Sequence, residues 1–356
     1  MNKEKRDITI LAIGDKADYD SYRKWHHAKA SFLDHGFDYA TTDYTRLLDG
    51  KMPRIKTENV IIFLFFPFSY WDSHIEHKNY RGIYANRVFY RKFVRFWDMV
   101  ESRLKKQLAG KKVVFVNDPR LCGAYRDKLT VTRKLDEFRI PQSRLYNVSG
   151  VEEIRDKLSG GHEFFIKPRY GSMGKGITFL SRSGWQTNFI FKNNKIISRR
   201  SDHGWRFNDV TGKTGFLRQL LRDDFLIQKA VDPLILDGNK VDFRIYTFFN
   251  KVIYVYPRKN ASGKVTTNIS QGGQGDSGLL EILPGSLVSR AEKEAVRVSK
   301  ALNINFAGID IMPDKNLKDL YVLDVNVFSG LPGKKTFDLA ECVAGELSKK
   351  GRVLFS

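Results

Sequence analysis

The chain has 356 residues with 42% hydrophobic and 13% aromatic side chains, and its formal charge is +21. This composition can fill a large core, and the length predicts two or three domains. The longest purely apolar run, Val60 to Phe68, is far shorter than the roughly 20 residues that span a bilayer, which excludes a spanning helix. The first residues lack the apolar region of a signal peptide, and Cys122 and Cys342 build no disulfide framework, so we expect a cytoplasmic protein.

The excess of lysine and arginine favours an anionic partner, such as nucleic acid, polyphosphate, an acidic peptide or an anionic membrane surface. The basic residues are spread along the chain, with the highest density in residues 87–106 and 199–206 and no basic tail. A solvated basic surface explains this distribution about as well as a specific site for a polyanion. We therefore expect substrates of anionic character, but neither a membrane nor a nucleic acid as the partner.

The first third of the chain predicts a mostly parallel sheet with helices on its faces. Short β-branched or aromatic runs, separated by stretches long enough for helices, are typical of βαβ units. These runs are residues 7–14, 60–66 and 112–118. Residues 84–110 place apolar side chains at three- and four-residue steps and stop at Gly110, which predicts an amphipathic helix packed on that sheet. We expect residues 1–118 to form an N-terminal α/β domain.

The pattern changes after Pro119. Helices are predicted at residues 126–138, 151–158, 291–303 and 335–351. Strands are predicted within residues 164–180, on both sides of a glycine tip, and at 224–231, 240–250, 251–260, 304–313 and 319–328. We expect two further units, residues 119–223 with the glycine tip and residues 224–356. The fold class is therefore mixed α/β.

The stretch FFIKPRYGSMGKGITFL, residues 164–180, holds a glycine-rich run with a lysine. A P-loop needs GK followed by Ser or Thr at the start of a helix, but Lys175 is followed by Gly176 and then by a strand. A dinucleotide fingerprint is absent as well. What remains is a hairpin whose tip can bring backbone N–H groups close to an anion, with Lys167 pointing at the same place. A flexible hairpin without a ligand is the alternative.

Two carboxylates and an amide lie in the last two predicted strands. Asp310 is followed fourteen residues later by Asp324 and then by Asn326. Alternation places residues 324 and 326 on one face of a strand, and the short turn between the strands brings Asp310 alongside. Oxygen ligands of this kind suit Mg²⁺, which bridges nucleotide phosphates. Polar residues flanking a turn are the alternative, but unpaired carboxylates in buried strands are costly.

Taken in chain order, these motifs resemble the ATP-grasp superfamily, and most closely its glutathione synthetase and ribosomal-protein glutamate ligase branch. The residues that carry the resemblance are Lys128, Lys167, Gln228, Lys229, Asp242, Arg244, Arg258, Asn268, Asp310, Asp324 and Asn326. They span roughly residues 118–335, and the preceding segment is similar to the Rossmann-like domain that such enzymes carry there. The resemblance therefore implies an ATP-grasp fold preceded by a parallel-sheet domain.

The resemblance implies ATP and Mg²⁺, or Mn²⁺ in its place, as cofactors. The phosphates would contact Lys128 and Lys167 under a lid of Gly171, Ser172, Met173, Gly174, Lys175 and Gly176. Adenine would bind the backbone at the edge of the strand at residues 224–231, near Gln228, Lys229 and Val231. The implied catalytic residues are Arg244, Arg258 and Asn268, and the implied metal ligands are Asp310, Asp324 and Asn326.

The usual reaction of this branch joins a carboxylate to an amine through an acyl-phosphate, with ADP and phosphate as products. We expect a small-molecule or peptide carboxylate and amine as substrates, and a homodimer, which is frequent in such families. Two features depart from the family pattern: Asp324 stands where the family generally has Glu, which shortens the metal ligand by one methylene, and VFSGLPG after Asn326 resembles the ending of inositol-phosphate kinases. This ending, together with the charge of +21, keeps a kinase open. The first alternative is thus phosphorylation of a hydroxyl on an anionic polyol, and the second is a non-catalytic binder of polyanions or nucleic acid.

Two polar segments have weaker signals. His74, Glu76 and His77 follow the predicted strand at 60–66 and could touch the substrate, although a solvated loop is favoured over a metal site there. An insertion after the glycine hairpin contains the candidates for gripping an anionic substrate, which are Arg199, Arg200 and Arg206.

Overall fold

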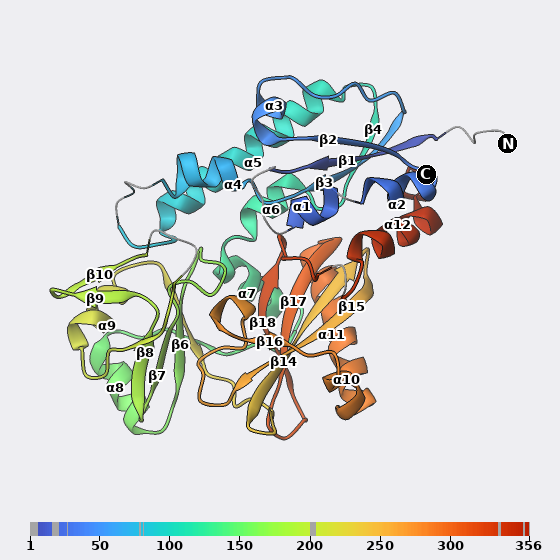
Figure 1. The fold of residues 1–356 in the computed structure, drawn as a ribbon. Helices are drawn as coiled ribbons and strands as arrows, with labels where there is room; N and C mark the ends of the chain where they lie inside the picture. The colour runs from blue at the N-terminus through green and yellow to red at the C-terminus, as the bar shows by residue number, and fades with distance from the viewer. Residues whose placement is uncertain are drawn as a thin grey trace.

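In the computed structural model of the chain, the described residues are 6–15, 21–26, 28–77, 80, 82–199, 204–333, 336–351 and 353–355. Their strands form three main sheets and a separate two-stranded hairpin. We call the main sheets the N-terminal sheet, the lid sheet and the C-terminal sheet, and Figure 1 shows the first above the other two. In this part of the chain no helix combines the length and the apolarity that crossing a membrane requires.

The N-terminal sheet is parallel, as the sequence predicts, with the strand order β2-β1-β3-β4. Its strands are β1 (Ile8–Ile13), β2 (Asp38–Thr42), β3 (Asn59–Leu64) and β4 (Lys112–Phe115). The sequence pattern does not indicate β2, because this strand is polar and mostly half-buried. The predicted amphipathic helix is α5 (Arg87–Gln107), which buries Phe93, Phe96 and Trp97 in one core with this sheet.

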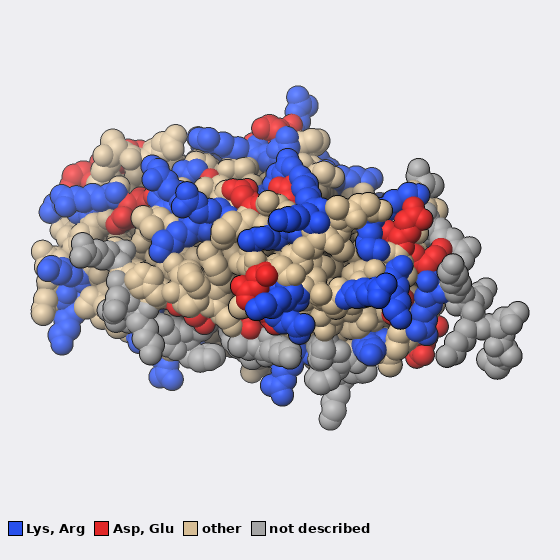
Figure 2. All heavy atoms as spheres, turned by 90° about the horizontal axis from the view of Figure 1, so that it is seen from above, with Lys and Arg blue, Asp and Glu red and all other residues tan. Residues whose placement is uncertain are grey.

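Shorter helices complete the N-terminal part. They are α1 (Ser21–His26), α2 (Lys29–Asp34), α3 (Tyr44–Leu48), α4 (Phe68–Tyr70), a π-helical turn (Trp71–Ile75) and α6 (Pro119–Ala124). On the face seen in Figure 2, lysine and arginine side chains lie in separate groups with Asp and Glu between them. The net charge of +21 therefore forms no continuous basic stripe on this face.

The lid sheet is antiparallel, with the order β11-β8-β7-β6-β12-β5. Its strands are β5 (Leu145–Tyr146), β6 (Phe164–Pro168), β7 (Thr178–Ser181), β8 (Gly184–Thr187), β11 (Asn208–Asp209) and β12 (Phe225–Lys229). It shares a core with α8 (Val151–Ser159) and α9 (Thr214–Leu220), beside the hairpin of β9 (Ile190–Lys192) and β10 (Lys195–Ile197). The glycine run connects the paired strands β6 and β7, so the predicted hairpin is confirmed.

The C-terminal sheet follows the order β16-β15-β14-β17-β18, with β13 added to β14. Its strands are β13 (Ile235–Leu236), β14 (Asn239–Phe248), β15 (Lys251–Ala261), β16 (Gln274–Gly275), β17 (Phe306–Pro313) and β18 (Leu320–Asn326). The neighbouring helices are α7 (Lys128–Glu137), α10 (Leu279–Ile282) and α11 (Gly285–Leu302), and 3-10 turns occur at Ile269–Gln271 and Val353–Phe355. Val241, Phe243 and Ile245 of β14 pack under α7 and α11, so the alternating Asp242 and Arg244 point to the opposite face. We call this opposite face the charged face.

The last helix, α12 (Leu339–Lys350), bridges the two ends of the chain. Val343 and Leu347 share a core with Ile10 and Phe32 of the N-terminal part and with Phe248 of the C-terminal sheet. In Figure 1 this helix lies beside α2, above the rest of the C-terminal part. The division of the chain at residues 118 and 223 stays a prediction, and α12 does not pack within the third unit alone.

Candidate active site

Two connected cavities lie along the charged face. The inner pocket is bounded by the lid sheet and the C-terminal sheet, and its lining includes Lys128, Lys167, Gly171, Lys175, Gln228, Lys229, Val231, Asp242 and Leu323. The outer cleft lies between the C-terminal sheet and the end of β3, and its lining includes Phe66, Phe68, Arg126, Met173, Arg244, Asn326 and Phe328. Both cavities are bordered by Ser172, Gly174, Arg258, Asn268, Asp310 and Asp324. Of the residues that the resemblance assigns to nucleotide, catalysis or metal, only Gly176 lines neither cavity.

Lys128 and Lys167 approach the inner pocket from different elements. Lys128 is the first residue of α7, and its Nζ lies 2.5 Å from Asp324 Oδ1. Lys167 Nζ, from β6, lies 5.6 Å from the centre of the Phe165 ring, and it makes no hydrogen bond or ion pair with another described residue. Burial lowers the pKa of Lys167 to about 8, although Asp324 and Asp310 act in the opposite direction. The pocket therefore holds a cation without a direct counter-charge.

The glycine loop between β6 and β7 lies over the boundary of the two cavities. Ser270 Oγ donates a hydrogen bond to the Met173 carbonyl at 3.0 Å, and Asn188 Nδ2 donates to the Gly174 carbonyl at 2.6 Å. Gly174 has a φ of +66°, and a Cβ at this position would lie 2.9 Å from Asn268 Nδ2. Both the left-handed backbone and the close approach require glycine here. The loop is thereby fixed against the C-terminal part.

The side chain of Lys175, the lysine inside the glycine run, points to the N-terminal part. It contacts residues there rather than pointing at the place of a bound phosphate. Its Nζ lies 3.8 Å from Glu76 Oε2, and only 3% of the Lys175 side chain and 7% of the Glu76 side chain are exposed. The ring centre of Tyr84 is 4.9 Å from the same Nζ, and Trp71 Nε1 donates to Glu76 at 2.7 Å. A solvated loop is therefore the wrong interpretation at Glu76, which joins the glycine loop to the N-terminal part.

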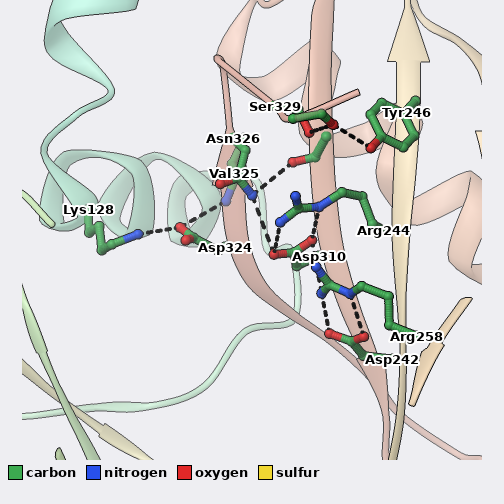
Figure 3. Close-up of polar contacts among 12 residues, drawn as sticks. Lys128, Asp242, Arg244, Tyr246, Arg258, Asp310, Asp324, Val325, Asn326 and Ser329 are labelled. Atoms are coloured by element: carbon green, nitrogen blue, oxygen red, sulfur yellow. Dashed lines mark hydrogen bonds and ion pairs between the residues drawn. The ribbon is translucent and has the colours of Figure 1, made fainter. Parts of the chain in front are cut away.

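Two arginines and two aspartates form a nearly buried cluster on the charged face (Figure 3). Arg244 donates from Nε and Nη2 to the two oxygens of Asp310, both at 2.8 Å. Arg258 binds both oxygens of Asp242 in the same way and lies 3.1 Å from Asp310 Oδ1. Burial disfavours the ionised form of Asp310, but Arg244 and Arg258 prevail and hold its pKa below the usual range. The four charges therefore neutralise one another.

Asp310 and Asp324 lie opposite each other in the β17–β18 pair, as the sequence predicts. The register then shifts, because Ile311 pairs with Val322 and leaves Leu323 without a partner. This β-bulge breaks the strict alternation of side chains. Leu323 and Asp324 both line the inner pocket as a result.

The oxygens of Asp324 and Asn326 are chemically suited to a divalent cation. The Asp324 side chain is 33% exposed, whereas both oxygens of Asp310 already accept from an arginine. Asn326 Nδ2 donates to Asp310 Oδ2 at 3.4 Å, which holds the amide beside the two carboxylates. In the described ranges, no group of three His, Cys, Asp or Glu side chains could hold a metal ion, either here or at His74 and His77. A cation at this site would therefore need water or ligand oxygens as well, which is how Mg²⁺ is usually held.

The strand expected to bind adenine through its edge is not an edge strand. β12 lies between β6 and β5, and Gln228 pairs with Phe165 on one side and with Leu145 on the other. The N–H of Lys229 donates to a carbonyl of the segment before β5 at 2.9 Å. Gln228 and Lys229 therefore have no free strand edge, because the two-residue strand β5, which has too little pattern to be recognised, pairs with β12. The adenine contacts at this strand stay a prediction. Val231, beyond the end of β12, also lines the inner pocket.

The basic insertion is described only in part. Arg200 lies outside the described residues, and Arg199 has a buried Nε. Arg206 lines a polar groove with Lys264, between the lid sheet and the C-terminal sheet. The structure therefore brings one basic side chain of this insertion near the entrance of the cavities.

Sequence reasoning misses the aromatic wall of the outer cleft. We define this wall as Phe66 and Phe68, which follow β3, and Phe328, which follows β18. The ring centres of Phe66 and Phe68 are 4.8 Å apart, and those of Phe66 and Phe328 are 5.7 Å apart. Arg126 lies against this wall, with its guanidinium carbon 5.8 Å from the centre of the Phe66 ring. The place of Phe66 at the carboxyl end of a parallel strand is the signal that could have found it.

The comparisons with known sequences agree with this arrangement. The family model described as YheC/D-like ATP-grasp matches residues 121–346, which is more than half of the chain. The endospore coat-associated protein YheD of Bacillus subtilis (strain 168) is 27% identical over 133 residues, 34% of this chain and 27% of YheD. A probable alpha-L-glutamate ligase of Ectopseudomonas mendocina (strain ymp) is 28% identical over 116 residues, 33% of this chain and 34% of the ligase. The alignments thus span only about a quarter to a third of these relatives.

Solved structures resemble the whole chain in fold. The ATP-grasp ligase PsnB, complexed with a minimal precursor, has a TM-score of 0.57 and 14% identity, over 97% of this chain and 99% of that chain. D-alanine–D-alanine ligase from Bacillus anthracis has a TM-score of 0.52 and 13% identity, over 98% of this chain and 99% of that chain. At this identity the likeness concerns the fold alone, and it confirms the predicted ATP-grasp fold with a preceding parallel-sheet domain.

Proposed function

Because the chain belongs to the YheC/D-like ATP-grasp family, we propose that it is an ATP- and Mg²⁺-dependent ligase that joins a carboxylate to an amine. The observation that carries the proposal is Lys167, a partly buried cation without an anionic partner among the described residues. It lines the same pocket as the oxygens of Asp310 and Asp324. A nucleotide with its divalent cation would supply negative charge to the lysine and positive charge to the carboxylates.

The binding roles follow from these positions. Lys167 and Lys128 bind the phosphates, and the glycine loop from Gly171 to Gly176 covers them. Adenine lies at the end of β12, where Val231 offers backbone groups beyond the paired strand. Asp324 and Asn326, with Asp310, are the oxygen donors for Mg²⁺ or Mn²⁺. When bound, the cation would neutralise charge on the phosphate oxygens.

The chemistry requires positioning and charge neutralisation rather than a side-chain nucleophile. Arg258 and Asn268 border both cavities, so they lie where a phosphoryl group would pass from the inner pocket to an acceptor in the outer cleft. Arg244 lines the outer cleft, and its Nη1, which takes no part in the two hydrogen bonds to Asp310, would hold the acceptor carboxylate. Transfer of the phosphoryl group to this carboxylate gives an acyl-phosphate, and an amine then displaces phosphate to form the amide.

The acceptors that we propose are small or peptide carboxylates. PsnB has been solved with its precursor, and the relatives named above include a probable glutamate ligase, which together favour these two substrate classes. The outer cleft is lined by charged and aromatic side chains, including Arg244 and Phe328, so it can distinguish acceptors by their side chains. The expected homodimer stays a prediction.

The proposal is tested by measuring ADP and free phosphate in parallel while a library of acids and amines is offered with Mg²⁺-ATP. Ligation releases one phosphate for each ADP and forms an amide that mass spectrometry detects. A phosphorylated product with ADP but without free phosphate would instead establish the kinase alternative. Polyanion binding that needs no Mg²⁺-ATP, with no turnover of any acid, would establish the non-catalytic alternative.

A further inference from the structure

Arg126 is a cation of the outer cleft to which the proposed reaction gives no role. It lies between α6 and α7, and its guanidinium carbon is 4.6 Å from the centre of the Trp71 ring and 5.8 Å from that of Phe66. Its Nε donates to the Tyr170 carbonyl at 2.8 Å. The aromatic rings and this hydrogen bond hold the guanidinium in one place.

The two terminal nitrogens of Arg126 differ from those of the other arginines at the site. Arg244 and Arg258 each bind an aspartate through two nitrogens, and Arg169 binds Asp127 in the same way. The terminal nitrogens of Arg126 have no hydrogen-bond or ion-pair partner among the described residues, and Arg126 is half-buried. A guanidinium that is immobilised and unpaired is preorganised to bind a carboxylate through two hydrogen bonds.

The aromatic wall indicates what kind of group the ligand carries besides its anionic groups. Phe66, Phe68 and Phe328 are half-buried and line the same cleft as Arg126 and Arg244. Their exposed ring surfaces favour an apolar or aromatic group, which gains stability when it leaves water. The cleft therefore combines an unpaired cation, an apolar wall and the arginine next to the phosphoryl-transfer site.

We propose that the acceptor is an acid with two anionic groups and an apolar side group between or beside them. One carboxylate lies at Arg244 and is the group that becomes phosphorylated. The second anionic group binds the terminal nitrogens of Arg126, and the apolar group packs on the aromatic wall. This inference rests on the proposed function, and it names the substrate class and Arg126 as the residue that selects it.

The test measures binding of three probes to the full-length protein by calorimetry, with and without a non-hydrolysable Mg²⁺-ATP analogue. Benzylsuccinate has two carboxylates and a ring, 4-phenylbutanoate has one carboxylate and a ring, and succinate has two carboxylates without a ring. We expect benzylsuccinate to bind about tenfold more tightly than either of the others. Equal affinity for benzylsuccinate and 4-phenylbutanoate in the unmodified protein overturns the inference without any variant.

Variants then assign the preference to its residues. Arg126→Met should remove the preference for benzylsuccinate over 4-phenylbutanoate, and Arg126→Lys, which keeps the charge, should retain part of it. Arg120→Met is the matched control, because Arg120 is exposed and paired with Glu101. An unchanged preference in Arg126→Met would contradict the inference. These binding measurements need no turnover. The result on Arg126 can therefore be interpreted even if the ADP assay detects no ligation.

Discussion

The two walls of the inner pocket treat their charges differently. On the C-terminal wall, Arg258, Asp242 and Asp310 are nearly buried and bind one another, and Arg244 of the outer cleft joins them through Asp310. On the lid wall, Lys167 has no ion-pair partner within the described part of the chain. On the C-terminal wall the cost of burying charged groups is therefore offset by ion pairs within the protein. On the lid wall a bound anionic ligand would offset it. The C-terminal wall therefore contributes a fixed frame, while the lid wall contributes affinity for an anion.

The strongest test of the fixed frame is Arg258→Met. Removing this guanidinium leaves the carboxylate of Asp242 buried without its counter-charge, which should lower the free energy of unfolding by about 3–5 kcal/mol. Urea denaturation measures the loss. Arg155→Met, which removes an exposed arginine paired with Glu152, should change stability by less than about 1 kcal/mol. Similar free energies of unfolding for the two variants would show that the cluster does not stabilise this wall.

Asp324→Ala tests the accessible carboxylate on the same wall. Because the side chain is 33% exposed, the fold should persist, whereas loss of a cation ligand should reduce turnover by about a hundredfold. Initial rates over a range of Mg²⁺ concentrations provide the measurement. Asp319→Ala, in the exposed turn before β18, serves as the control and should leave the rate unchanged. Normal Mg²⁺-dependent turnover of Asp324→Ala would contradict the role of Asp324 as a cation ligand.

Lys167→Met tests the lid wall. The variant should bind ATP about thirtyfold more weakly, which corresponds to roughly 2 kcal/mol for a lost charge-assisted hydrogen bond. Without nucleotide it should be at least as stable as the unmodified protein, since no ion pair with a described residue is lost and a partly buried charge is removed. Calorimetry gives the affinity and thermal unfolding gives the stability, with Lys264→Met in the polar groove beside Arg206 as the control. An unaltered affinity would contradict the role of Lys167.

The smallest effect concerns pH. The pKa of Lys167 is about 8 in the free protein, so the lysine is charged below that pH and neutral above it. Bound phosphates favour the charged form and raise this pKa, so binding takes up a proton near pH 8 and above. ATP affinity should therefore fall by up to about tenfold between pH 7 and pH 9. Lys167→Met should lose this dependence; if it keeps the same pH profile, another group is responsible.

The sequence predicts those parts of the molecule that depend on a short connection or on a regular local period. Asp310 and Asp324 pair as expected because two short strands joined by a tight turn leave few registers open. The amphipathic stripe of α5 likewise places Phe93 and Trp97 in the core. In both cases the local sequence pattern and the tertiary packing favour the same arrangement.

The features that were missed or wrongly predicted depend on contacts between distant segments. β12 is interior because a two-residue strand, Leu145–Tyr146, pairs with it, and so short a segment has no recognisable period. The direction of Lys175 is decided by Glu76, which is almost a hundred residues away in the sequence. Arg126 is oriented by Trp71 and Phe66 from the N-terminal part. No pattern within the glycine run or around Arg126 contains this information.

The position of α12 has a consequence for when the N-terminal part can fold during synthesis. Val343 and Leu347 of this helix fill the core around Ile10 and Phe32, which leave the ribosome much earlier. Domains commonly begin to fold during synthesis from the N-terminus onward. Here the N-terminal sheet cannot close its core until residue 350 has been translated. We expect nascent chains that stop before residue 339 to be cut by protease in their first 118 residues, and chains that include α12 to resist.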